Sequence, residues 1–201
     1  MAKAAATWCN HFQNPTLLVL LSYLWFKVQA DTHILRCSFT VETRFITREF
    51  IPQCSVDGVP FHPYDKDNTR NEGNAPKKCA DLFPKLKDIE EELRSQLHIM
   101  EENGDLTRGN HSLLVTAVSL YKEEQPINGY WNFTLDGYHS FSFNSFDSKN
   151  KKYALTHNNI PGIDKWQNNI KLAQDLETFS IGDSDLCFQE ILSQSKKMAS
   201  K

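Results

Sequence analysis

The 201-residue sequence predicts an α+β fold in which one antiparallel sheet carries two long helices on one face. Three observations predict it: alternating apolar residues typical of half-buried strands, two Asp-Gly pairs typical of hairpin turns, and two long segments with apolar residues at helical spacing. The elements follow the same order in both halves of the chain. The hairpin turns leave no room for a helix between every pair of strands, which excludes a βαβ arrangement.

The first half begins with a strand whose apolar residues occupy alternate positions: Leu35, Cys37, Phe39 and Val41. A second strand is predicted over 49–56. It leads into the Asp57-Gly58 turn and returns through 59–61. A helix is then predicted over about 76–102, ending at Asn103-Gly104. The apolar positions of this helix are Leu82, Leu86, Ile89, Leu93, Leu97 and Met100.

The second half repeats this order. Strands are predicted over 112–121 and around residues 131–135, then the Asp136-Gly137 turn and a return strand with Phe141 and Phe143. One more short strand fits residues 153–156. The helical spacing resumes at Ile163 and continues to Phe179, and Gly182 interrupts it. Ser184 or Asp185 is expected to cap a further helical segment.

Residues 1–30 are typical of a secretory signal peptide. Lys3 lies near the start, an apolar run covers much of residues 17–26, and Val28-Gln29-Ala30 places small residues just before Asp31. The run is shorter than the roughly 20 residues that span a bilayer, which favours cleavage after Ala30 over a signal anchor. We therefore expect an extracellular protein, secreted or displayed on the cell surface.

The segment that remains, residues 31–201, has the size of one domain and is mildly acidic. Two of the 22 basic residues and none of the 25 acidic residues lie in the first thirty, so the remaining net charge is about −5. A chain of this charge without a basic stripe argues against nucleic acid and anionic membranes as partners.

Four cysteines remain after the signal peptide: Cys37, Cys54, Cys79 and Cys187. An even number in an oxidising compartment predicts two disulfides, and three pairings are possible. None of these cysteines belongs to a CxxC pair or has a histidine at zinc-ligand spacing, so neither a metal site nor a cofactor is expected. Two sequons, Asn110-His111-Ser112 and Asn132-Phe133-Thr134, predict glycans at Asn110 and Asn132, below or beside the sheet and away from the helices.

Several short segments, spread over nearly the whole chain, carry a family resemblance. They are Met1-Ala2-Lys3-Ala4-Ala5, Leu20-Leu21-Ser22-Tyr23, Asp31-Thr32-His33-Ile34-Leu35-Arg36, Gln53-Cys54-Ser55-Val56-Asp57-Gly58, Lys78-Cys79-Ala80-Asp81-Leu82, Asn128-Gly129-Tyr130-Trp131 and Lys165-Trp166. The opening strand and the two-half order resemble the major histocompatibility (MHC) class I platform. The resemblance is strongest to the minor histocompatibility antigen 60 family and its retinoic-acid-early-inducible relatives, ligands of the activating receptor natural-killer group 2 member D.

This resemblance implies an MHC class I-like platform over 31–201, with an α1-like half (31–109) and an α2-like half (110–201). It implies a receptor ligand that is not an enzyme and that has no microglobulin light chain, because the chain ends where an immunoglobulin-like third domain would begin. Cys37 stands where peptide-presenting relatives carry a groove tyrosine, which implies a closed groove without peptide. Family members are held on the membrane, whereas residues 196–201 carry no hydrophobic tail, so we expect either secretion or attachment by means that the sequence does not show.

On such a platform we expect the disulfides Cys54–Cys79 and Cys37–Cys187, each joining the sheet to a helix. The family's receptor, a symmetric C-type-lectin-like homodimer, lies diagonally over both helices. Its contacts are therefore expected on the later half of the first helix and the middle of the second. The candidate receptor-binding residues are Glu91, Arg94, Ser95, His98, Asn168, Lys171, Leu172, Gln174 and Asp175.

Two other functions compete with the receptor ligand. A secreted MHC-like carrier would hold a lipid or small apolar molecule between the helices. Gly182-Asp183-Ser184 resembles the opening of a lipase-like serine hydrolase motif, but its place near the end of the domain favours a turn and a helix cap. The histidines at positions 33, 62, 98, 111, 139 and 157 are scattered among turns and strand ends, as expected for surface residues.

Overall fold

The computed structural model of the chain describes residues 32–44, 50–62, 75–146, 162–163, 166 and 168–199, and the backbone of residues 153–155. Seven strands form one sheet in the order β3-β2-β1-β4-β5-β6-β7, and every pairing for which the register is defined is antiparallel. The strands are β1 (Thr32–Glu42), β2 (Gln53–Val56), β3 (Val59–Phe61), β4 (Ser112–Lys122), β5 (Gln125–Leu135), β6 (His139–Asn144) and β7 (Tyr153–Leu155).

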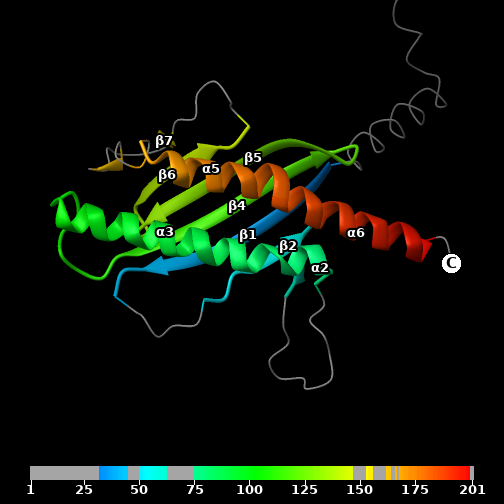
Figure 1. Cartoon of the computed structure of the whole chain (residues 1–201), viewed down its shortest axis with the longest axis horizontal. Coiled ribbons are helices and arrows are strands. Elements are labelled where there is room, and N and C mark those ends of the chain that lie inside the picture. Colours follow the sequence, from blue (N-terminus) through cyan, green and yellow to red (C-terminus); the bar gives the residue numbers. More distant parts are fainter. Residues whose placement is uncertain are drawn as a thin grey trace, which may run out of the picture. The chain divides into compact units, whose positions relative to one another are not determined.

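The helices lie on one face of this sheet, so the predicted α+β class is confirmed (Figure 1). They are α2 (Lys77–Ala80), α3 (Leu82–Glu102), α5 (Ile170–Thr178), the π-helical turn η1 (Phe179–Asp183) and α6 (Ser184–Ala199). The first long helix, α3, runs beside the second, which α5, η1 and α6 form together (Figure 1). Of the helices in the described part of the chain, none is long and apolar enough to cross a lipid bilayer.

Both predicted Asp-Gly turns are present and have the backbone conformation that tight hairpins need. Asp57 and Gly58 have φ of 52° and 80°, and Asp136 and Gly137 have φ of 51° and 74°. Two successive residues with positive φ match the right-handed twist of the strands that they join. The Asp57 carboxylate also accepts hydrogen bonds from His33 Nδ1 (2.7 Å) and from the Ile34 N–H (2.9 Å), which fixes the turn to β1.

The second strand is shorter than the predicted 49–56. Residue 49 lies outside the described residues, and β2 begins only at Gln53. Pro52 directly precedes it, and a proline has no N–H to donate to a neighbouring strand. The short strand predicted over 153–156 is present as β7 and pairs with β6.

The first predicted helix, 76–102, is divided at Asp81 into α2 and α3. Pro84 explains the division. It cannot donate to the carbonyl of Ala80, and its ring would clash with that carbonyl in a continuous helix. The same proline is tolerated where it stands because it falls in the first turn of α3, where an N–H has no partner within the helix.

The second long helix continues through the predicted interruption at Gly182. Residues 179–183 widen into a π turn, and α6 follows directly, so the expected cap at Ser184 or Asp185 is wrong. Ser184 is fully buried within the helix. The predicted helical start near Ile163 agrees with the described residues Ile163 and Trp166, which are both helical and buried, but residues 168–169 are not helical and α5 begins at Ile170.

The sheet holds this π turn by hydrogen bonds to Ser180. Trp131 Nε1 donates to Ser180 Oγ (2.9 Å) and to the Leu176 carbonyl (3.1 Å), and Ser145 Oγ also donates to Ser180 Oγ (3.0 Å). Ser119 Oγ donates to the Ser180 carbonyl (3.3 Å). Two strand residues, Trp131 and Ser119, and Ser145 just after β6 thereby satisfy the polar groups that the wider turn brings to the sheet.

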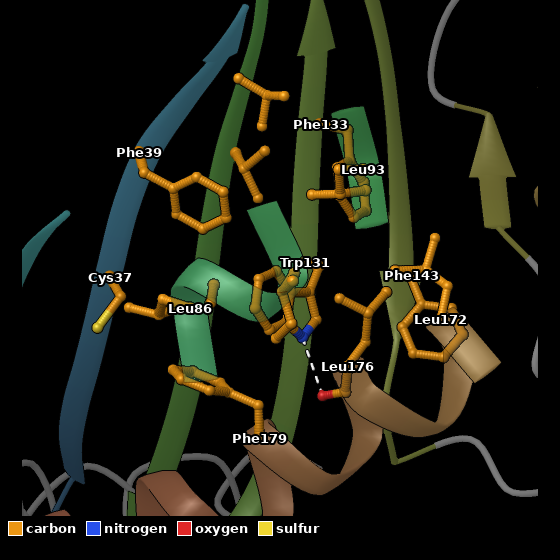
Figure 2. Close-up of a cluster of buried hydrophobic side chains, with 14 of the residues drawn as sticks. Cys37, Phe39, Leu86, Leu93, Trp131, Phe133, Phe143, Leu172, Leu176 and Phe179 are labelled. Carbon is orange, nitrogen blue, oxygen red and sulfur yellow. Dashed lines mark hydrogen bonds between the residues drawn. The ribbon is translucent and has the colours of Figure 1, made fainter. Parts of the chain in front are cut away.

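The core fills the space between the sheet and the helices. Leu86 and Leu93 from α3 meet Leu172, Leu176 and Phe179 from the second helix, as Figure 2 shows. Large aromatic side chains rise from β5 and β6 beneath them: Trp131, Phe133, Phe141 and Phe143. Phe133 stacks on Phe141 with ring centroids 4.8 Å apart, so bulky side chains occupy the interior between the two helices.

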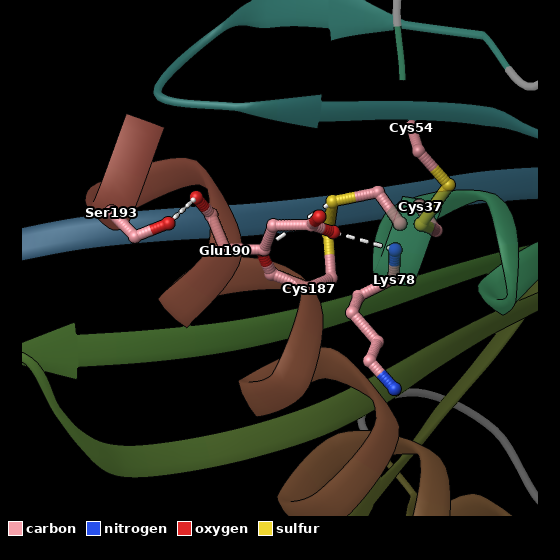
Figure 3. Close-up of a disulfide and its surroundings, with 7 residues drawn as sticks. Cys37, Cys54, Lys78, Cys187, Glu190 and Ser193 are labelled. Carbon is pink, nitrogen blue, oxygen red and sulfur yellow. Dashed lines mark hydrogen bonds between the residues drawn. A yellow bond between two sulfur atoms is a disulfide. The ribbon is translucent and has the colours of Figure 1, made fainter. Parts of the chain in front are cut away.

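The structure has two disulfides, as expected, but the predicted pairing is wrong. Cys37 is bonded to Cys54, and Cys79 is bonded to Cys187 (Figure 3). Cys37 and Cys54 are register partners on neighbouring strands, with Cα atoms 4.1 Å apart. The first bridge therefore lies within the sheet, and the second joins α2 to α6 with Cα atoms 4.4 Å apart.

Candidate interaction surface

The outer surface of α3 and of the second long helix, which we term the helical face, carries the candidate site. Covalent and polar contacts connect the α2–α3 segment to the second long helix. Near one end, the Cys79–Cys187 disulfide and the Lys78 N–H, which donates to Glu190 Oε2 (2.6 Å), connect α2 to α6 (Figure 3). At the middle of α3, Glu92 contacts the start of α5.

Glu92 receives three hydrogen bonds. Asn169 Nδ2 (2.9 Å) and Gln96 Nε2 (3.2 Å) donate to Oε1, and Lys171 Nζ donates to Oε2 (3.1 Å). Burial would raise the pKa of Glu92, but these hydrogen bonds and the charge of Lys171 outweigh it and hold the pKa below its usual value. The same contact raises the pKa of Lys171. The pair is therefore ionised at neutral pH.

A recess of about 460 Å³ lies between the two helices beside this contact. Ile89 and the buried Phe179 contribute apolar lining, and charged side chains make up most of the remainder: Lys85, Asp88, Glu91, Glu92, Lys171, Asp175 and Asp183. Burial raises the pKa of Asp183 above its usual value. We term this recess the crease; its lining is more polar than expected of a lipid or peptide groove.

Of the nine candidate receptor-binding residues, six are exposed on the helices or just before α5: Glu91, Ser95, His98, Asn168, Lys171 and Gln174. Asp175 is half-buried and lines the crease with Glu91 and Lys171. Arg94, Ser95 and His98 line a second depression on the flank of α3. Glu91 borders both, so the structure divides the predicted surface into a central part and a flank.

Leu172 does not belong to this surface. Its side chain is 0% exposed and packs in the core with Leu176 and Phe179, which corrects its prediction as a receptor contact. The sequence prediction extended the helical spacing from Ile163 through residue 172. Because α5 begins at Ile170 after the Asn169 cap, the positions facing outward are shifted.

Arg94 is engaged with the protein itself. Its guanidinium donates to Glu90 Oε1 on the same helix and to the Glu42 carbonyl at the end of β1 (3.2 Å). Glu90 is 3% exposed, and burial raises the pKa of its carboxyl, with the charge of Arg94 opposing that shift. Arg94 therefore compensates a buried acid on the side of α3 that faces the sheet edge.

The helical face also carries exposed apolar residues outside the nine candidate receptor-binding positions. Ile181 and Leu186 are 38% and 53% exposed on η1 and α6, and Ile99 is 39% exposed on α3. The helical spacing in the sequence could have identified Ile99 as exposed, since Ile99 lies outside the apolar stripe of α3. For Ile181 and Leu186 the π turn changes the spacing, which no local pattern indicated.

His111 departs from the expectation of surface histidines. It is buried, its Nδ1 lies 2.7 Å from Asp136 Oδ2, and its Nε2 lies 2.7 Å from the Thr107 carbonyl oxygen. Glu101 Oε1 is 3.7 Å from Nε2. Burial would lower the pKa of His111, but these three groups outweigh it and raise the pKa. His111 thereby joins the segment between α3 and β4 to the β5–β6 turn.

Both sequon asparagines are exposed. Asn110 precedes β4. Asn132 lies in the middle of β5 between Trp131 and Phe133, whose side chains are buried beneath the helices. Because successive side chains of a strand point to opposite faces, Asn132 lies on the face of the sheet away from the helices.

No family model matches the sequence. Over 186 residues, 92% of this chain, it is 30% identical to histocompatibility antigen 60b of Mus musculus. That match covers 66% of the relative, so the chain spans just under two thirds of its length. Over 174 residues, 86% of this chain, it is 29% identical to histocompatibility antigen 60c of the same species, of which it covers 78%. Since the likeness extends over most of the sequence, the resemblance found in the sequence is confirmed, and this chain belongs to the histocompatibility antigen 60 family.

Proposed function

We propose that this protein is an extracellular ligand of the activating receptor natural-killer group 2 member D, and that it promotes recognition and lysis of the cell displaying it. In this proposal its fold is an MHC class I-like platform, and the homodimeric receptor binds the helical face. The ligand has no enzymatic activity, no microglobulin light chain and no bound peptide.

The observation that carries the proposal is the filled and bridged space between the two helices. Trp131, Phe133 and Phe179 occupy the interior beneath them, the buried Cys79–Cys187 disulfide joins α2 to α6, and the Glu92–Lys171 contact joins α3 to α5. A presenting or carrying protein needs an open groove there, with apolar walls that its cargo would cover. A surface that offers only its own side chains suits recognition of the protein itself.

The composition of the helical face supports a reversible contact. Exposed charged and polar residues such as Glu91, His98 and Gln174 alternate with the partly exposed Ile99, Ile181 and Leu186. Interfaces of non-obligate partners have this mixed character, and a few apolar residues within them usually contribute most of the binding energy.

The alternative is a secreted carrier of a lipid or small apolar molecule. Native mass spectrometry of the glycosylated protein from mammalian cells separates the two functions. The carrier predicts a co-purifying apolar molecule of constant mass, whereas the receptor ligand predicts the mass of the polypeptide with its glycans alone.

Surface plasmon resonance of folded residues 31–201 over the immobilised receptor tests the partner. We expect saturable binding that Glu91→Ala, His98→Ala and Gln174→Ala each weaken. Arg36→Ala is the matched control, because Arg36 is exposed on the opposite face of the sheet between the buried Leu35 and Cys37. An absence of binding by a folded, disulfide-intact sample overturns the proposal. Equal effects of all four substitutions mean that the receptor binds elsewhere.

A further inference from the structure

Glu92 of α3 lies at the N-terminal end of α5, 77 positions away in sequence from its partner Asn169. Its side chain is only 20% exposed, and each of its carboxylate oxygens accepts a hydrogen bond from the residues that begin the second helix. The N-terminus of a helix carries a partial positive charge and free N–H groups. A carboxylate held there from another helix is therefore favourably placed.

Asn169 connects this carboxylate to the backbone of α5. Its Oδ1 accepts from the Leu172 N–H (3.0 Å), which caps the helix, while its Nδ2 donates to Glu92 Oε1 (2.9 Å). The Asn169 carbonyl also accepts from the Ala173 N–H (3.1 Å). Because one planar amide makes both side-chain contacts, the hydrogen bond to Glu92 fixes the orientation in which Asn169 caps the helix.

Lys171 completes the arrangement. It lies in the first turn of α5, its side chain is 73% exposed, and its ammonium group donates to Glu92 Oε2 (3.1 Å). Two residues that begin α5 are thus bonded to one residue of α3. The first turn of a helix is its least constrained part, because its N–H groups have no partners within the helix.

We infer that Glu92 is a positioning residue: it orders the first turn of α5 from the neighbouring helix and so sets the geometry of the α5 half of the helical face. In this role Glu92 touches no receptor atom. The consequence for receptor binding rests on the proposed function, whereas the ordering of α5 does not.

Amide hydrogen exchange, followed by NMR on the folded domain without receptor, tests the ordering directly. Glu92→Ala is expected to speed exchange of the Leu172 and Ala173 amides about fivefold, the change that corresponds to a typical lost helix cap. Glu92→Gln keeps an acceptor for Asn169 without the charge, and its effect should be intermediate. Glu91→Ala is the matched control, since it removes a neighbouring acid of the crease that faces solvent.

Substitutions at Asn169 separate its capping of α5 from its hydrogen bond to Glu92. Asn169→Ser keeps a good capping oxygen but removes the amide Nδ2 that donates to Glu92, and Asn169→Asp keeps the cap while placing a second carboxylate against Glu92. If the hydrogen bond between Asn169 and Glu92 orders the first turn of α5, exchange of the Leu172 amide should be faster in both variants, and fastest in Asn169→Asp. Unchanged exchange at Leu172 in Glu92→Ala overturns the inference.

The kinetics of receptor binding supply a second test, whose expected result a loss of overall stability alone would not produce. A surface whose binding-competent state is populated only in part associates more slowly, so Glu92→Ala should mainly reduce the association rate. Glu91→Ala, which removes a direct contact, should mainly increase the dissociation rate. If Glu92→Ala increases the dissociation rate but does not speed amide exchange at Leu172 and Ala173, Glu92 is a receptor contact, and the positioning role is overturned. If the unsubstituted protein does not bind, the proposed function fails, and hydrogen exchange still decides the inference.

Discussion

Cys37 on β1 lies directly opposite Cys54 on β2, with their Cα atoms 4.1 Å apart and a disulfide joining them. This bridge closes a loop with a sequence separation of 17 between the neighbouring strands β1 and β2. The second bridge, Cys79–Cys187, closes a segment with a separation of 108. The two disulfides therefore restrict the unfolded chain to very different extents.

Removal of the longer bridge should cost more stability. By the loop-entropy relation, Cys79→Ala with Cys187→Ala should lower the free energy of unfolding by about 4–5 kcal/mol, and Cys37→Ala with Cys54→Ala by about 3 kcal/mol. Urea unfolding of the two double variants measures the difference. Peptide mapping without reductant checks the pairing beforehand, and recovery of Cys54 linked to Cys79 would contradict the structure.

Two glycines should respond in opposite directions to replacement by alanine. At Gly129 a Cβ would lie 3.0 Å from Ser180 Cβ and 3.1 Å from Phe146 Cε2, so Gly129→Ala should destabilise the fold by about 1–3 kcal/mol. At Gly182 nothing lies within 4 Å, and Gly182→Ala should stabilise the helix by roughly 0.5–1 kcal/mol. Thermal unfolding of both variants compares them. A stabilised Gly129→Ala would refute the close contact between β5 and the π turn.

His111 should make stability depend on pH in a defined direction. Both ring nitrogens face acceptors, the Asp136 carboxylate and the Thr107 carbonyl, and only the protonated ring can donate to both. Because the pKa in the folded protein is raised above 6.5, this contribution is fully present below pH 6.5 and is lost as the pH rises through the folded-state pKa.

The test compares urea unfolding of the wild type and His111→Gln from acidic to mildly alkaline pH. The substitution keeps the Asn110 sequon, and the difference in stability should shrink as the pH rises. His98→Gln, at an imidazole that is 48% exposed, is the matched control. A difference that stays constant with pH would show that protonation of His111 does not contribute.

Glycans are expected on Asn110 and Asn132 when the protein is made in mammalian cells. Both side chains are exposed, and the Asn132 glycan should project from the face of the sheet opposite the helices. Glycosidase treatment should increase gel mobility, and each of Asn110→Gln and Asn132→Gln should remove one step of that shift. A double variant with the mobility of the untreated wild type would refute both sites.

Local signals in the sequence predicted most of the fold. The Asp57-Gly58 and Asp136-Gly137 turns were recognisable because Asp-Gly suits two residues with positive φ. The β4–β5 hairpin makes the same kind of turn with Glu123 and Glu124, at φ of 50° and 66°. Glutamate has no preference for that conformation, so no composition signal marked this turn.

The features that the sequence did not predict depend on contacts between distant segments. Cysteine pairing followed from the register of β1 against β2 and from the meeting of α2 and α6, neither of which cysteine spacing specifies. Glu92 carries no local signal of its role, because its partners Asn169 and Lys171 begin another helix. Only Asn169, a common capping residue before an apolar helical segment, carried a local signal of its role.

The Cys79–Cys187 bridge also determines how the molecule responds to mechanical force. Tension along the backbone that enters at β1 and leaves through the end of α6 reaches Cys79 and can cross to Cys187 through the covalent sulfur bridge. The intervening chain, with α3, β4, β5, β6 and α5, lies outside this load path. α3, α5 and η1 are thus protected from extension, whereas the part of α6 after Cys187 carries the load, so most of the surface can persist while the chain on either side is pulled.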